Sequence, residues 1–375
     1  MPPLQPIAKS RIVLSGVNFN EGGPLSVFRD ALNELTRLHG DRYHVIALVH
    51  RRALFDTANV TYLEFPHIKS SWLRRLVFEY WQCRALSRSL RPHLWLAMHD
   101  ITPNVTADIR AVYCHNPAPF HRISLEEART DSKFALFTLF YQFLYAINLH
   151  RNHFVIVQQQ WIRDEFHRRY GPANIVVAHP SIPLLASSGA DPFPPNPNRP
   201  CRFIYPALPR PFKNIELLLE AAELLQQRNA PPFELWLTIN GNENHYARKL
   251  FARHQHLQSV HWLGLLPRER VMQLYAAADC LLFPSRLETW GMPISEFKQT
   301  GKPIFVADLP YAHETVGSYN AVHFFSSRDA SALAHTIDLY LRGDLQFPNR
   351  IARPVLEPFA PNWKALFNIL LTPHQ

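Results

Sequence analysis

The sequence predicts an α/β protein with two domains, and three observations support this fold class. The chain has 375 residues, which is long enough to form two hydrophobic cores. Short apolar runs typical of buried strands alternate with helical segments, the order that gives parallel sheets covered by helices. A proline-rich stretch, residues 187–200, separates two such series. It cannot form a helix or a central strand, so it marks a boundary between domains.

The first series begins with a predicted strand at residues 11–16, which leads into a loop that contains glycine. Apolar residues then recur at helical spacing from Leu25 to Leu35 and predict a helix over 25–38. Further strands are predicted at residues 43–49, 94–98, 111–114, 154–157 and 175–178. These elements make residues 1–182 a Rossmann-like N-terminal domain.

The second series follows a linker that we place at residues 183–201. Its strands are predicted at residues 203–205, 233–239, 260–263, 280–283, 304–306 and 321–325, and its helices at 215–228, 268–277 and 294–300. They make residues 202–358 a second Rossmann-like domain. The last segment, 359–375, carries apolar residues at helical spacing and is predicted to close the fold as an amphipathic helix.

The composition is that of a globular protein, since 47% of the residues are hydrophobic and 18% are charged. The formal net charge of +9 suits a nucleic acid, an anionic membrane surface or a phosphorylated substrate. The sequence shows no nucleic-acid-binding motif, so nucleic acid is the weakest of these partners. The four cysteines lack the spacing of metal ligands, and no metal site is predicted.

Several features predict a cytoplasmic protein, with contact to the inner face of a membrane left open. The sequence has no recognisable signal peptide and no apolar run of about 20 residues. Cys114 and Cys280 lie in apolar strands and read as buried thiols, which favours a reducing compartment. Residues 67–81 mix basic and aromatic side chains, as membrane-surface helices do, and core packing explains them equally well. Residues 134–149 are apolar, and for them core packing is the preferred interpretation.

The most informative stretch is residues 285–296, which places two carboxylates, Glu288 and Glu296, eight residues apart. The apolar segment before it is stopped by Pro284 and reads as a buried strand. Pro293 suits the first turn of a helix, so Glu288 is expected in the loop and Glu296 about one turn inside the helix. Amide groups at the start of that helix are free to face an anion. This arrangement suits a ligand with both phosphates and hydroxyls, such as a sugar nucleotide.

The stretch resembles the Glu-x7-Glu motif of the retaining glycosyltransferases of family 4, the glycosyl transferases group 1, which adopt the GT-B fold. The resemblance implies two Rossmann-like domains that face each other across a cleft, with the nucleotide bound by the C-terminal one. It implies that Glu296 accepts hydrogen bonds from the ribose hydroxyls and that Glu288 faces the donor sugar. The amides of Gly291 and Met292 fit a role on the sugar or the phosphates. Trp290 stands where the family motif has Phe or Tyr.

The resemblance also implies a metal-free site for the diphosphate in the loop after the strand at 203–205. The leaving diphosphate gains negative charge as the glycosidic bond breaks, so fixed cations favour the reaction. Lys213 and Arg210 match the family's two cations, although a Tyr-Pro pair replaces the usual Gly-Arg opening and makes the match of Arg210 the looser one. Gly241 resembles a strand-end loop near the nucleotide, and Leu265 and Leu266 resemble the segment whose backbone reads the base.

Candidate residues in the first half also follow predicted strands. Gly22 and Gly23 occupy a glycine loop that would approach the phosphates or the acceptor. His115 resembles the active-site histidine of the family, and a structural role explains it equally well. The pair His99 and Asp100 is a further, weaker candidate of the same kind.

The resemblance implies a retaining, metal-independent hexosyltransferase that needs no cofactor. Its donor would be a nucleotide-diphosphate sugar, GDP- or UDP-linked, and its acceptor a glycan or a lipid-linked saccharide in surface polysaccharide assembly, such as that of lipopolysaccharide. Two alternatives stay open: a non-catalytic GT-B-like protein that binds a glycan or nucleotide, and a nucleotide-sugar epimerase. A dehydrogenase is excluded because the chain lacks the Gly-x-Gly-x-x-Gly fingerprint. The sequence does not identify the sugar, the base, the acceptor or the linkage.

Overall fold

The computed structural model describes residues 9–20, 22–121, 123, 132–171, 173–182 and 199–372. Its internal contacts divide the chain into two compact units. The first unit comprises Met1–Phe120, Phe137–Ser181 and Val355–Gln375, and the second comprises His121–Leu136 and Ile182–Pro354. Of the expected linker at 183–201, residues 183–198 lie outside the described residues.

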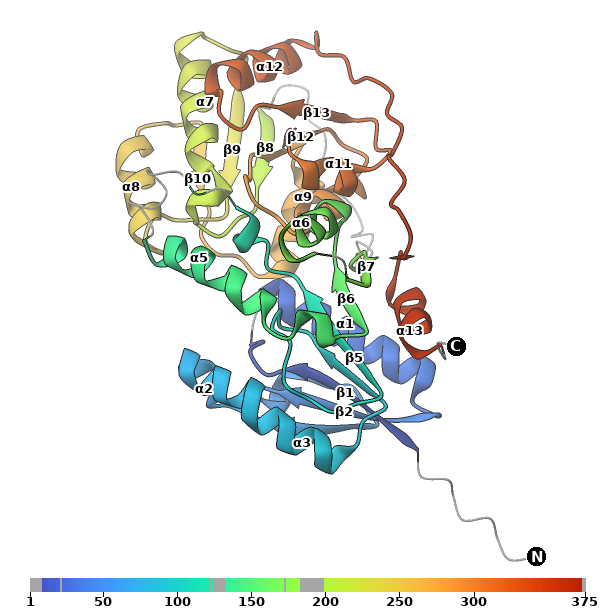
Figure 1. Cartoon of the computed structure of the whole chain (residues 1–375). Helices are drawn as coiled ribbons and strands as arrows, with labels where there is room; N and C mark the ends of the chain where they lie inside the picture. Colours follow the sequence, from blue (N-terminus) through green and yellow to red (C-terminus); the bar gives the residue numbers. More distant parts are fainter. Residues whose placement is uncertain are drawn as a thin grey trace, which may run out of the picture. The chain divides into compact units, whose positions relative to one another are not determined.

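The first unit is built on a parallel sheet with the strand order β14-β7-β6-β5-β4-β1-β2-β3 (Figure 1). The strands are β1 (Ser10–Gly16), β2 (Tyr43–Val49), β3 (Val60–Glu64), β4 (Leu94–Ala97), β5 (Ile109–Cys114), β6 (Phe154–Val157), β7 (Ile175–Ala178) and β14 (Phe359–Ala360). The helices are α1 (Gly22–His39), α2 (Trp72–Val77), α3 (Cys83–Leu90), α6 (Gln160–Tyr170), α13 (Trp363–Leu371) and α5 (Ser132–Ala146), whose residues up to Leu136 are grouped with the second unit. Alternate residues of β1 point into two separate cores: Ile12 and Leu14 pack with α1 and α13, and Val13 packs with Phe78 and Tyr145.

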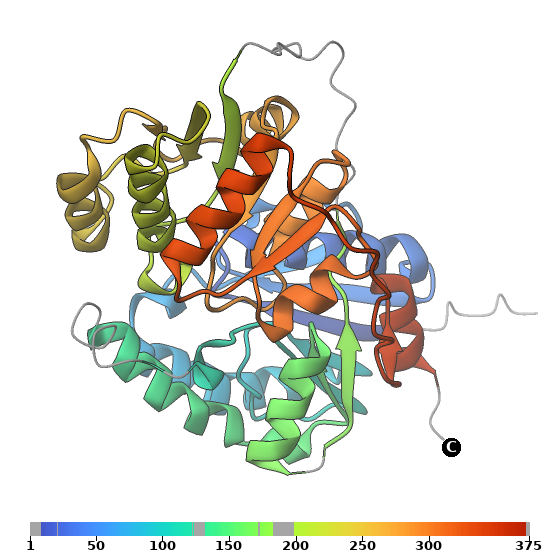
Figure 2. The same ribbon diagram turned by 90° about the horizontal axis from the view of Figure 1, so that it is seen from above.

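The second unit repeats this design around a parallel sheet ordered β10-β9-β8-β11-β12-β13. The strands are β8 (Cys201–Tyr205), β9 (Phe233–Leu237), β10 (Val260–Trp262), β11 (Cys280–Phe283), β12 (Ile304–Ala307) and β13 (Val322–Phe325). The helices are α7 (Ile215–Gln227), α8 (His245–His254), α9 (Arg268–Ala277), α10 (Met292–Lys298), α11 (Pro310–Val316) and α12 (Ala330–Arg342). Figure 2 shows α7 and α12 side by side, and the two helices are in contact.

Each sheet has a point at which the order of its strands reverses. In the first unit β1 lies between β2 and β4, and in the second β8 lies between β9 and β11. Loops leave the carboxyl ends of such a strand pair in opposite directions, which is where doubly wound α/β proteins bind ligands. Gly22 begins the helix that follows β1, and His99 lies in the loop after β4; the loops after β8 and β11 carry Lys213 and Glu288. The predicted α/β class with two Rossmann-like sheets is confirmed.

The C-terminal segment returns to the first unit. Asn362 caps α13 by accepting a hydrogen bond from the Ala365 N–H at 2.9 Å. The helix packs against α1, and β14 pairs with β7 at the edge of the first sheet. The predicted closing helix is therefore present. The pairing of β14 was not predicted, because a two-residue strand has no periodicity to detect.

Candidate active site

Lys213 and Glu288 come together at the carboxyl ends of β8 and β11. Lys213 ends a short helical turn after β8, and Glu288 lies in the loop between β11 and α10. The Lys213 Nζ is 2.5 Å from Glu288 Oε1, with 18% of the lysine side chain and 14% of the glutamate side chain exposed. Because β8 and β11 are adjacent and parallel, two residues 75 positions apart meet at one edge of the sheet. The pair therefore lies at the switch point of the second unit.

Hydrogen bonds between the two loops hold this pair in place. The Arg286 N–H donates to the Phe212 carbonyl at 2.7 Å. The side-chain amide of Asn214 donates to the Pro284 carbonyl at 3.1 Å. Asn214 is itself left-handed, with φ 58°, a conformation that asparagine tolerates better than most residues. The cation and the carboxylate thus sit on loops that are bonded to each other.

Arg210 lies in the same loop as Lys213 but is held differently. Its carbonyl accepts the Lys213 N–H at 2.9 Å. Its side chain is exposed and makes no ion pair or side-chain hydrogen bond within the described residues. The guanidinium is therefore available to an anion that approaches this loop, whereas the Lys213 ammonium already has a carboxylate partner.

Glu296 lies inside α10, as the sequence predicted, and its side chain is 7% exposed. Arg268 Nη2 is 2.6 Å from its Oε1, and the Tyr275 hydroxyl donates to its Oε2 at 3.2 Å. Burial raises the pKa of Glu296, while Arg268 and Tyr275 oppose that shift. A carboxylate has about four lone-pair sites, so these two partners leave capacity for further donors such as ribose hydroxyls.

Sequence reasoning did not single out Arg268 and Tyr275. They lie seven residues apart on α9, so two helical turns bring them to the same face. A buried carboxylate needs partners that donate hydrogen bonds or carry positive charge. The seven-residue spacing of Arg268 and Tyr275 on α9 was the feature of the sequence that could have pointed to them.

Gly241 follows β9 and has a structural reason to be glycine. Its φ is +90°, and an added Cβ would lie 2.5 Å from the Cβ of Phe251. Its backbone N–H donates to Glu243 Oε2 at 3.0 Å. The glycine is therefore required by packing against Phe251, and its role toward a nucleotide stays a prediction.

The remaining candidates of the second unit lie at the same edge of the sheet. Leu265 and Leu266 follow β10, and the side chain of Leu265 is exposed. Gly291, with φ +82°, precedes α10, and Met292 is the first residue of that helix. The first amides of a helix have no partner within it, which leaves the amide of Met292 available to a ligand. Their contacts with a nucleotide remain predictions.

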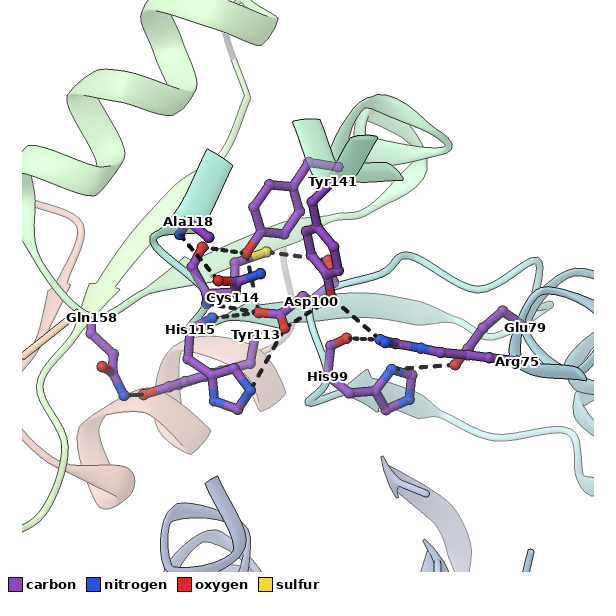
Figure 3. Close-up of polar contacts among 12 residues, drawn as sticks. Arg75, Glu79, His99, Asp100, Tyr113, Cys114, His115, Ala118, Tyr141 and Gln158 are labelled. Atoms are coloured by element: carbon purple, nitrogen blue, oxygen red, sulfur yellow. Dashed lines mark hydrogen bonds and ion pairs between the residues drawn. The ribbon is translucent and has the colours of Figure 1, made fainter. Parts of the chain in front are cut away.

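In the first unit, Asp100 is the centre of a buried polar cluster (Figure 3). Its Oδ1 accepts the N–H groups of His115 at 2.7 Å and Asn116 at 3.0 Å, and the Tyr145 hydroxyl at 3.1 Å. Its Oδ2 accepts the Tyr141 hydroxyl at 3.2 Å. Asp100 has φ 74°, so these four hydrogen bonds hold an aspartate in the left-handed region. Asp100 thereby fixes the turn that carries His115.

His115 was predicted as a site residue, and its side chain lies next to this carboxylate. The His115 Nε2 is 3.8 Å from Asp100 Oδ2, which is too long for a hydrogen bond. The ring also lies against Phe19, with centroids 5.3 Å apart. His115 is thus positioned by packing and by its backbone.

His99, beside Asp100, is completely buried and contacts three polar residues. Its Nε2 is 3.0 Å from Ser15 Oγ, and its Nδ1 is 3.3 Å from Glu79 Oε1. Arg75 donates to the His99 carbonyl at 2.7 Å. Burial lowers the pKa of His99 and raises the pKa of Glu79 to about 8, so both groups favour their neutral forms. Figure 3 shows Arg75 and Glu79 reaching this cluster from the same side.

Sequence reasoning missed Arg75 and Glu79. The available signal was Glu79 itself, which is the only carboxylate between residues 65 and 99 and lies within an apolar helical stretch.

The predicted site residues Gly22 and Gly23 are exposed at the start of α1, and an added Cβ at either would meet nothing within 4 Å. These two glycines carry no packing constraint, and their role toward a ligand stays a prediction.

Comparison with known families identifies the class to which the second unit is related. Residues 193–353 match the family model described as Glycosyl transferases group 1. This span contains Arg210, Lys213, Glu288 and Glu296. The predicted resemblance to the group 1 glycosyl transferases is confirmed.

Individual relatives agree with that class. O-antigen chain mannosyltransferase B from Escherichia coli is 32% identical over 120 residues, which are 32% of this chain and 32% of the relative. The match thus spans about a third of that relative's length.

Solved structures share the fold over most of the chain. The lipopolysaccharide outer core galactosyltransferase WaaB, in its apo form, has a TM-score of 0.62 at 16% identity, covering 96% of this chain and 98% of WaaB. A glycosyltransferase from Rickettsia africae has a TM-score of 0.65 at 13% identity, covering 89% and 88%. Anabaena HepE, solved with UDP-glucose, has a TM-score of 0.58 at 17% identity, covering 89% and 90%. These likenesses confirm the GT-B fold.

Proposed function

We propose that the protein is a glycosyltransferase that moves a hexosyl unit from a nucleotide-diphosphate sugar to a glycan or lipid-linked saccharide. The observation that carries this proposal is the Lys213–Glu288 pair at the switch point of the second unit. It lies within the span that matches the group 1 glycosyl transferases, and the helix that follows it carries the buried Glu296. A setting in surface polysaccharide assembly is supported by the similarity to an O-antigen chain mannosyltransferase over 120 residues.

Each group at this edge has a role in the proposed reaction. Lys213 and the exposed Arg210 bind the diphosphate, and the Lys213 ammonium then bridges a phosphate oxygen and Glu288. Glu288 also accepts hydrogen bonds from hydroxyls of the donor sugar. Glu296 is held in place by Arg268 and Tyr275 and accepts hydrogen bonds from the ribose hydroxyls. Preorganised charges of this kind supply much of the stabilisation of a transition state.

The proposed transfer retains the anomeric configuration and proceeds without a metal. The bond from the anomeric carbon to the diphosphate oxygen breaks, and the acceptor oxygen bonds to the same face of the sugar. The acceptor proton passes to the leaving phosphate. Lys213 and Arg210 balance the charge that the diphosphate gains. We expect activity to survive EDTA and the product to keep the donor's anomeric coupling constant by NMR; an inverted product or loss of activity in EDTA would contradict this mechanism.

The acceptor is proposed to bind the first unit, at the loops that carry Gly22, Gly23 and His115. These loops leave the carboxyl ends of β1 and β5, near the switch point of that sheet. A lipid-linked acceptor would bring the protein to the inner face of a membrane from the cytoplasm.

A thermal-shift experiment with GDP, UDP, dTDP and ADP tests the donor site. A diphosphate at 100 times its dissociation constant should stabilise the protein by about 2.7 kcal/mol. We expect one nucleoside diphosphate to raise the melting temperature of the wild type, and Lys213→Ala and Glu296→Gln to abolish the shift. Lys249→Ala and Glu269→Gln, which change exposed charges of the same unit, should keep it. No shift with any diphosphate, or a shift that survives in the site variants, would remove the basis of the proposal.

A further inference from the structure

An exposed apolar surface lies on two helices of the first unit, away from the residues assigned so far. We define the α2–α5 surface by Leu73, Val77 and Trp81 on the helical stretch from 72 to 90, and by Leu139, Phe140 and Phe143 on α5. Leu73 is 71% exposed, Trp81 74%, Leu139 60% and Phe143 63%. Contiguous exposure of large apolar groups marks a surface that meets a partner.

The two helices form one surface because they pack against each other. The Trp72 ring lies 6.0 Å from the ring of Phe137 and 6.0 Å from that of Tyr141, centroid to centroid. Tyr141 and Tyr145 occupy the opposite face of α5 and are buried in the core. Core packing was the preferred interpretation of residues 134–149, and it accounts for only one face of α5. The opposite face is also apolar, but its side chains are exposed.

Positive charge lies beside this surface, and the described residues of its two helices carry no exposed carboxylate. Arg74, Arg84 and Arg88 are exposed on the same helical stretch. Between residues 65 and 99 the only carboxylate is Glu79, which is buried. Residues 132–163, which include α5, contain no aspartate or glutamate. An apolar surface with tryptophan at its edge and arginine beside it is typical of a helix that lies in the interface of an anionic bilayer.

We propose that the α2–α5 surface docks the protein on an anionic lipid bilayer. A second copy of the chain fits less well, because a two-fold contact would bring the arginines of both copies together without carboxylates to balance them. Docking is interfacial: among the residues that the structure describes, no helix is long and apolar enough to cross a membrane.

The docking helix also reaches the polar cluster at the switch point of the first unit. The stretch that exposes Leu73 and Trp81 sends Arg75 inward to the His99 carbonyl, at 2.7 Å. The same helical stretch therefore contacts the bilayer on one side and the polar cluster beside the proposed acceptor region on the other. This inference rests on the proposed function in one respect, which is that a lipid-linked acceptor gives the docking its purpose.

Flotation of the full chain with phosphatidylglycerol or phosphatidylcholine vesicles tests the proposal. We expect the wild type to float with the anionic vesicles, less as salt rises, and not with the neutral ones. Arg84→Gln/Arg88→Gln should weaken binding roughly 25-fold, at about fivefold per charge. Trp81→Ser/Phe143→Ser should weaken it by roughly tenfold or more. The matched control is Ile351→Ser/Leu356→Ser, which removes exposed apolar groups elsewhere and should bind as the wild type does.

Three results would overturn the docking proposal. They are absence of flotation with anionic vesicles, equal flotation of all variants, and a concentration-dependent dimer that Trp81→Ser/Phe143→Ser dissolves. The nucleoside-diphosphate shift is measured on the same preparations. A kept shift without flotation refutes docking alone, and flotation without a shift refutes the donor site alone. Melting temperatures of the variants near that of the wild type establish that they are folded.

Discussion

Replacing Lys213 by methionine separates its effect on stability from its effect on catalysis. The substitution keeps the length and apolar stem of the side chain but leaves the Glu288 carboxylate, only 14% exposed, without its partner at 2.5 Å. Breaking a fully buried ion pair costs about 3–5 kcal/mol, and an exposed pair contributes about 0–1 kcal/mol. For this mostly buried pair we expect the free energy of unfolding to fall by about 2 kcal/mol. The second unit should then melt about 4–8 °C lower.

The double variant Lys213→Met/Glu288→Gln is the decisive comparison. It removes both charges, so its stability should return to within about 1 kcal/mol of the wild type. Its kcat/KM for sugar transfer should stay depressed by roughly 10²–10³-fold, the size of the loss when one preorganised electrostatic group is removed.

Circular dichroism melting and a coupled assay for released nucleoside diphosphate measure the two quantities. Lys249→Met, at an exposed lysine of α8, is the control and should change neither. If transfer activity recovers with stability in the double variant, Lys213 acts only through the fold, and its assigned role toward the diphosphate is refuted.

Three further predictions concern charge and backbone. Burial raises the pKa of Glu79 to about 8, so the folded protein holds this proton more tightly than the unfolded chain. Between pH 6.5 and pH 8 the free energy of unfolding of the wild type should therefore fall by about 1.5 kcal/mol more than that of Glu79→Gln, as measured by urea titration. Parallel pH profiles of the two proteins would contradict this. Arg268→Gln removes a cation that holds the pKa of Glu296 down, so that pKa should rise. The loss of nucleoside-diphosphate affinity on acidification should then begin at a higher pH, as measured by calorimetry. An unchanged pH dependence would argue against ribose binding by Glu296. Gly241→Ala should cost about 2 kcal/mol or more because of its positive φ and a clash at 2.5 Å, whereas Gly343→Ala, left-handed but unobstructed, should cost about 1 kcal/mol; equal thermal shifts would refute the role of the clash.

Much of the fold was determined by local sequence. The strands β2, β6, β7 and β11 and the helix α9 have the bounds that their apolar patterns predicted. The strands are mainly apolar because both faces of a parallel strand are buried, so each strand's own residues show the pattern. Elements with weaker patterns, such as the edge strand β3, were not predicted.

The candidate site was determined only partly by sequence. The spacing of Glu288 and Glu296 placed one carboxylate in a loop and the other inside a helix, as the structure has them. It did not show that Lys213 pairs with Glu288, because that contact depends on β8 and β11 being neighbours in the sheet. Strand order arises from the packing of the whole unit, so the local sequence does not carry it.

The tertiary structure alone decided which similar residues are buried and which are exposed. Leu73 and Phe78 lie in one helical stretch, yet the first is exposed and the second completely buried. Glu79 is a carboxylate among basic residues, and it is buried beside His99. The sequence determined the two sheets and the chemical groups at their ends, because those depend on apolar periodicity and on neighbours along the chain. The structure decided the pairings and the exposed face, because these depend on which distant segments cover each side chain.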